Sequence, residues 1–151
     1  MKSVLRISFI LLLSAALFGC TKTIVVTPVN PLEGTWILTD AAEADAYGWY
    51  PIVTGLESGS FSFYGNGTAQ YYDGHFNMRG TWTLGTQAGG YYDEYGNYYN
   101  GVHQFMEVHL YDSYSNSSID LYFDNVEFRG NRFAATYFNN GYISRYRFSR
   151  Y

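Results

Sequence analysis

The stretch RFAATYFNNGYISRYRF, residues 132–148, indicates the fold class of this chain of 151 residues. Aromatic and β-branched residues alternate with small or polar ones on both sides of Asn139-Asn140-Gly141. Alternation with a period of two is typical of a strand that buries one face, and Asn-Gly between two such runs is typical of a tight hairpin. These residues therefore predict two antiparallel strands joined by a turn.

The same pattern recurs through the rest of residues 32–151. Short alternating runs are separated by Gly, Asn and Asp, and Phe61–Phe63 leads into the predicted turn Tyr64–Gly67. Only residues 40–47 resemble a helix start, since Asp40 can cap the first turn and Glu43 follows three residues later. We expect an all-β fold, an antiparallel up-and-down meander of about eight to ten strands. Closure into a lipocalin-like barrel would remove its exposed edges.

The N-terminal residues 1–19 have the features of a signal peptide. Lys2 and Arg6 accompany an apolar run, residues 7–18, that is shorter than the roughly 20 residues needed to cross a membrane. The run ends in Leu17-Phe18-Gly19-Cys20, which resembles a bacterial lipobox. Cleavage before Cys20, the only cysteine, would leave its sulfur to carry a lipid.

This pattern predicts three segments and a location. Residues 1–19 would be the lipoprotein signal peptide, residues 20–31 the lipidated cysteine and a tether, and residues 32–151 one domain. We expect an exported protein that is anchored in the lipid bilayer of the cell envelope. The outer membrane is favoured, and the periplasmic and surface faces stay equally open.

The charge distribution argues against one class of partner. Without Lys2 and Arg6 the chain keeps seven basic and thirteen acidic residues, a net formal charge of −6. We therefore expect no nucleic-acid binding. The basic residues gather at the C-terminal end, where they would orient the protein, admit an anionic ligand or, as we favour, simply face outward from strands: Arg129, Arg132, Arg145, Arg147 and Arg150.

Several short motifs occur in an order that resembles the lipocalin-like lipoproteins of Gram-negative bacteria. After the lipobox come Gly34-Thr35-Trp36, the aromatic run and turn at residues 61–67, Gly80-Thr81-Trp82 and the aromatic-arginine terminus Tyr146–Tyr151. The resemblance implies an eight-stranded barrel or half-open calyx in the envelope with no enzymatic activity. It assigns a structural, barrel-closing role to four residues: Gly34, Trp36, Gly80 and Trp82.

The residues themselves give little sign of chemistry. His103 and His109 would share one face of a strand with Glu107, which would suit a metal ion, but ordinary rim or surface histidines are favoured. The chain has no Gly-x-Ser-x-Gly nucleophile motif and no phosphate-binding glycine loop before a helix. We expect a protein that is not an enzyme and has neither a cofactor nor a metal.

Aromatic residues make up 21% of the chain, and they support two binding hypotheses. The first is a small amphipathic or aromatic ligand in a barrel cavity lined by Phe61, Phe63, Met106, Tyr122 and Tyr137. The second is a glycan- or protein-binding surface; a domain that acts on another envelope protein is a third option. Most strand tyrosines are expected in the core, because the domain is poor in aliphatic residues: Tyr71, Tyr111, Tyr122, Tyr137, Tyr142 and Tyr146.

The second hypothesis centres on YYDEYGNYYNG, residues 91–101. About eighteen residues separate the predicted strands that end at Leu84 and begin near Gln104, and connections of this length are often functional. The segment would be a flexible loop or a small hairpin whose turn is flanked by Tyr92 and Tyr98. It would cover the barrel or contact a ligand through its five tyrosines: Tyr91, Tyr92, Tyr95, Tyr98 and Tyr99.

Overall fold

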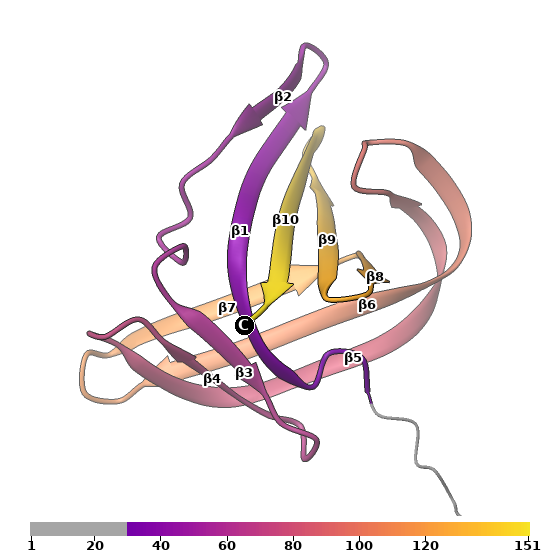
Figure 1. Cartoon of the computed structure of the whole chain (residues 1–151). Coiled ribbons are helices and arrows are strands. Elements are labelled where there is room, and N and C mark those ends of the chain that lie inside the picture. Colours follow the sequence, from indigo (N-terminus) through magenta and orange to yellow (C-terminus); the bar gives the residue numbers. More distant parts are fainter. Residues whose placement is uncertain (1–29) are drawn as a thin grey trace, which may run out of the picture.

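A computed structural model describes residues 30–151. The predicted signal peptide, Cys20 and most of the predicted tether lie outside the described residues. The described part contains strands and no helix (Figure 1). The strands are β1 (Gly34–Asp45), β2 (Gly48–Pro51), β3 (Ser60–Phe63), β4 (Thr68–Tyr72), β5 (Asn77–Tyr92), β6 (Tyr98–Asp112), β7 (Ser117–Phe123), β8 (Asn125–Arg129), β9 (Arg132–Asn139) and β10 (Tyr142–Arg150).

All strand pairs are antiparallel and belong to one curled sheet with the order β7-β6-β5-β4-β3-β1-β10-β9-β8, and β2 pairs with β1. The first strand therefore pairs with the last one, as in an up-and-down meander that folds back on itself (Figure 1). β7 and β8 are the two end strands of this order and do not pair with each other. They are nevertheless consecutive in the chain, with only Asp124 between them. The all-β, antiparallel prediction is confirmed, and closure into a barrel is not.

The hairpin at residues 132–148 forms as predicted. Asn139 pairs with Tyr142, and the two residues between them, Asn140 and Gly141, have positive φ angles of 50° and 90°. Such angles suit Asn and Gly and match the right-handed twist of the flanking strands.

The predicted helical turns at residues 40–47 are wrong, because this segment completes β1. β1 pairs with β10 on one side and with β2 on the other, and a register shift lies between Leu38 and Asp40. Ala42 and Ala44 are buried between these neighbours. Asp40, the predicted helix cap, lies inside β1. The Asp45 carboxylate accepts hydrogen bonds from the backbone N–H groups of Tyr47 and Gly48 and so stabilises the turn that follows the strand.

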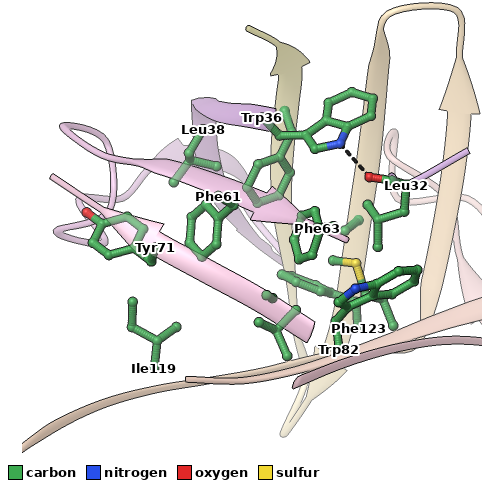
Figure 2. Close-up of a cluster of buried hydrophobic side chains, with 14 of the residues drawn as sticks. Leu32, Trp36, Leu38, Phe61, Phe63, Tyr71, Trp82, Ile119 and Phe123 are labelled. Atoms are coloured by element: carbon green, nitrogen blue, oxygen red, sulfur yellow. Dashed lines mark hydrogen bonds between the residues drawn. The ribbon is translucent and has the colours of Figure 1, made fainter. Parts of the chain in front are cut away.

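Aromatic side chains fill the concave side of the sheet (Figure 2). Trp36 is fully buried, and its indole N–H donates to the Leu32 carbonyl over 2.7 Å. Phe133 meets the Trp36 ring edge-on at 4.8 Å and stacks on Phe148 at 4.4 Å. Offset and edge-on arrangements of this kind are the favoured contacts between aromatic rings.

The second Gly-Thr-Trp motif has a comparable environment. The Trp82 indole N–H donates to the Tyr64 carbonyl over 3.0 Å, and its ring meets Phe63 edge-on at 5.8 Å. Gly80 lies against the neighbouring strand so closely that a Cβ atom would overlap the His109 carbonyl oxygen. The motif therefore places a large ring beside a position where no side chain fits.

The strand tyrosines contribute less to the core than the sequence predicts. Tyr71 is buried, and Tyr137 and Tyr146 are half-buried. The core prediction is wrong for Tyr111, Tyr122 and Tyr142, which are exposed. Phenylalanine, tryptophan, aliphatic residues and alanine fill the interior in their place.

Candidate functional site: the hairpin arm and the outer face

The segment at residues 85–101 is not a loop. β5 and β6 stay paired in one continuous register from Arg79 with Tyr111 to Tyr92 with Tyr98, and only residues 93–97 form the turn. The prediction of a long flexible loop is therefore wrong, and the alternative prediction, a hairpin with Tyr92 and Tyr98 beside the turn, is confirmed. We call residues 85–103 the hairpin arm. Its far end curls back toward β9 and β10 (Figure 1).

Glycines and aromatic rings interlock along the hairpin arm. Tyr91 stacks on Tyr99 at 5.7 Å and also lies 4.4 Å from the His103 ring. On the other side, Tyr98 covers Gly90 so closely that a Cβ atom there would overlap the tyrosine hydroxyl. Rings that cover glycines in this way protect a stretch of backbone that would otherwise be open to water.

Asp93 organises the turn at the tip of the arm. Its Oδ1 accepts hydrogen bonds from the backbone N–H groups of Tyr95 at 2.9 Å and Asn97 at 2.8 Å, and its Oδ2 accepts one from the Asn97 side chain at 2.9 Å. Burial alone would raise the pKa of Asp93. The hydrogen bonds outweigh burial, so the pKa lies below its ordinary value.

The tip of the arm docks on the side of β1, β8, β9 and β10 that faces away from the core. We call this side the outer face. The Thr136 hydroxyl donates to the Tyr92 carbonyl over 2.6 Å, and Arg145 donates to the Glu94 carbonyl over 3.1 Å. Tyr92 also packs against Phe138 at 4.9 Å. β6 lies beside β8, so the hairpin covers one of the two end strands of the sheet.

A network of ion pairs fastens the tip. Glu94 is buried, and its carboxylate binds Arg147 Nε at 2.8 Å and Arg129 Nη1 at 3.2 Å. Arg145 binds Asp40 at 2.9 Å on the same face. The guanidinium groups of the outer face therefore hold a carboxylate from the arm, in addition to facing outward as the sequence predicts.

An open groove of about 610 Å³ lies beside the docked tip. Glu94 and Tyr95 of the arm line it together with arginines of β8, β9 and β10. Arg129 and Arg132 are directly opposite each other across the β8–β9 turn, and both line the groove. Arg129 pairs with Glu94 and Glu127, whereas no carboxylate of residues 30–151 forms an ion pair with Arg132.

A row of apolar side chains crosses the outer face at the other side of the tip. The register places Trp49, Ala44, Ile143 and Phe138 next to one another on four adjacent strands. Trp49 and Phe138, at the two ends of the row, are 36% and 44% exposed. We call these four residues the aromatic row. Gly96 of the arm lies against Trp49 and Ile143.

The residues predicted to bind a ligand fall into three groups. Phe61, Phe63 and Met106 are packed in the core. Tyr122 and Tyr137 contact each other edge-on at 6.1 Å; Tyr137 is half-buried against the core cluster, whereas Tyr122 is exposed. Within the arm, Tyr91 and Tyr92 are half-buried, whereas the remaining three predicted contact residues are exposed: Tyr95, Tyr98 and Tyr99.

Sequence reasoning missed Trp49 and Phe138, and it did not connect the arginines with the arm. The concentration of arginines after residue 128 was the available signal for the groove. No comparable signal exists for the aromatic row, because its members come from four strands, β1, β2, β9 and β10, whose register only the fold defines.

The histidines lie apart from this region or are enclosed in the arm. His109 binds Asp120 at 2.9 Å, and both are exposed on β6 and β7. Hydrogen bonds from His109 and Ser118 lower the pKa of the Asp120 carboxyl. Within residues 30–151, no three His, Cys, Asp or Glu side chains gather in a metal-binding group, and no helix could span a membrane.

Comparison with known proteins gave no significant match to a family model, to a curated protein or to a solved structure. The likeness to lipocalin-like lipoproteins therefore stays a prediction from short motifs.

Proposed function

We propose that the chain is a non-catalytic envelope lipoprotein that binds a glycan on its outer face. The lipid anchor at Cys20 and the outer-membrane location belong to this proposal and are supported by the N-terminal sequence pattern. We place the ligand outside the sheet, because three of the five residues expected to line an internal cavity, Phe61, Phe63 and Met106, are packed in the core.

The aromatic row is the observation that carries the proposal. Its two exposed rings and the exposed Tyr98 ring of the neighbouring arm present flat apolar surfaces beside polar groups. Such surfaces suit the apolar faces of sugar rings, and the Tyr98 hydroxyl can bond to water or ligand at the edge. Arg145 stacks on the Trp49 ring at 4.4 Å, which fixes this ring at the surface before any ligand arrives.

A glycan array probed with the full chain in detergent tests this function. We expect binding to a subset of glycans and at least a tenfold loss of affinity for Trp49→Ala and Tyr98→Ser. Tyr114→Ser is the matched control, since Tyr114 is almost fully exposed in the turn between β6 and β7. The proposal fails if no glycan binds, or if the Tyr114 variant loses as much affinity as the other two.

Native mass spectrometry of the protein purified from its own host adds an independent test. A surface site leaves no small molecule enclosed, so we expect the mass of the protein with its lipid anchor alone. A stoichiometric additional small molecule would favour the internal ligand over the glycan surface.

A further inference from the structure

The groove beside the arm has an unmatched positive charge. Arg129, Arg132 and Arg147 line it together with Glu94 and Glu127. Both carboxylates are already held by Arg129 or Arg147, at 2.8 to 3.2 Å. Arg132 remains as the exposed guanidinium without an ion-pair partner in residues 30–151.

The position of Arg132 raises the electrostatic free energy of the protein when no ligand is bound. Arg129 and Arg132 are directly opposite each other in the β8–β9 hairpin, and like charges at such positions repel. The chain as a whole is acidic, so this groove stands out as a local attraction for anions. A bound anion would relieve the repulsion.

Tyr95 supplies a second group for a ligand. Its hydroxyl oxygen accepts a hydrogen bond from Arg129 over 3.3 Å, which leaves its own O–H proton free to donate. Its ring is 57% exposed at the edge of the groove. A planar ring, a hydroxyl donor and one free guanidinium fit a sugar ring that carries a single negative charge.

We propose that the groove binds the carboxylate of an acidic sugar unit, with Arg132 as its forked partner and the Tyr95 hydroxyl as a second donor. This inference rests on the proposed glycan-binding function and specifies its ligand class. Along β9, Phe138 of the aromatic row lies six positions after Arg132, which is roughly 20 Å at about 3.3 Å per residue. One oligosaccharide passing along the tip of the arm can therefore touch both places.

Isothermal titration of the full chain in detergent with an oligogalacturonate and with its methyl ester provides the test. The ester keeps the sugar rings and removes the charge. We expect the acid to bind at least tenfold more tightly, a difference of about 1.4 kcal/mol, since hydrogen bonds to a charged carboxylate are stronger than bonds to a neutral ester. Arg132→Gln should abolish this preference, and Arg132→Lys should restore only part of it, because lysine cannot bind a carboxylate with two parallel bonds.

The matched control is Arg79→Gln, which removes an arginine of β5 outside the groove and should keep the preference. Equal binding of acid and ester by the wild type, or a preference that survives Arg132→Gln, would overturn the acidic-sugar site while leaving glycan binding by the aromatic row intact. Binding to phosphatidylglycerol vesicles that depends on Arg132, without binding to the oligogalacturonate, would assign the groove to a lipid headgroup and also reject the sugar.

A different readout covers the case in which no oligosaccharide binds and the proposed function fails. Monomeric galacturonate titrated into labelled wild-type protein should then still shift the NMR signal of the Arg132 side-chain N–H saturably. The absence of a shift would reject the groove as an anion site.

Discussion

Replacing Glu94 by glutamine should loosen the hairpin arm while the rest of the sheet stays folded. The change keeps the shape of the side chain and removes its charge. The carboxylate is 10% exposed and receives Arg147 Nε at 2.8 Å, so this contact is a charge-assisted hydrogen bond in a mostly enclosed place. The backbone contacts of Tyr92 with Thr136 and of Glu94 with Arg145 remain.

The size of the effect follows from the Arg147 contact alone. Bonds to charged groups contribute about 1.5–3 kcal/mol and neutral ones about 0.5–1.5 kcal/mol, so the loss is about 1 kcal/mol. We take the lower end of the range for the lost free energy, because Arg147 is 36% exposed and keeps a longer contact of 3.5 Å with Asp40. We count nothing for Arg129, which solvent screens. A loss of about 1 kcal/mol corresponds to a roughly fivefold larger population of arms that are open.

Amide hydrogen exchange of the full chain in detergent measures this population. The Asp93 N–H, which donates to the Asn97 carbonyl over 3.0 Å, reports on the tip, and the Phe148 N–H reports on the core strands. We expect exchange about fivefold faster for Asp93 and unchanged for Phe148. Glu107→Gln removes the same charge from β6, where the described residues offer its side chain no hydrogen-bond or ion-pair partner.

Two results would refute this reasoning. If Glu94→Gln and Glu107→Gln change the exchange of the tip equally, the ion pairs do not fasten the arm. If Glu94→Gln accelerates the Phe148 N–H as much as the tip, the arm and the core open together and the arm is not a separate unit.

Three further predictions concern the core, a close contact and the turn. Phe61→Ala should lower the free energy of unfolding by about 3–5 kcal/mol in urea titrations, because the ring is fully buried. Gly80→Ala should lower the melting temperature, since its Cβ would meet the His109 carbonyl, whereas Gly101→Ala, with no atom within 4 Å, should not. Asp93 has a lowered pKa in the folded state, so it stabilises the arm above its ordinary pKa of about 3.8, and this stability is lost as the pH falls through the lower folded value. Asp93→Asn should therefore weaken the dependence of tip exchange on pH between about 2 and 5, and an unchanged dependence would contradict this.

Local sequence patterns predicted the hairpins because each hairpin depends on nearby residues. Alternation and Asn140-Gly141 were enough to define β9, β10 and their turn. The pairing of β1 with β10 joins residues more than 100 positions apart, and the burial of Ala42 and Ala44 between strands overrode a local pattern typical of a helix. Tertiary context commonly overrides such propensities.

The site was harder to predict than the fold for the same reason. Five tyrosines in a glycine-rich segment suggested a loop, yet Tyr98 covers Gly90 and Tyr91 stacks on Tyr99 of the opposite strand, contacts that support a strand pair. The groove needs Glu94 to meet Arg147 across a separation of 53 residues, and no spacing rule in the sequence brings them together.

The contacts that fasten the arm also form the groove, which links binding to the opening of the arm. An acidic sugar held by Tyr95 and Arg132 would bridge the arm and the outer face, so it would bind the docked arm and not the open one. A free ligand concentration of about 100 times the dissociation constant stabilises the docked arm, which binds the ligand, by about 2.7 kcal/mol relative to the open arm. This exceeds the roughly 1 kcal/mol expected from Glu94→Gln, so saturating oligogalacturonate should return the tip exchange of that variant to the wild-type rate or below it. Faster exchange that persists at saturation would mean that the ligand does not bridge the arm to the outer face.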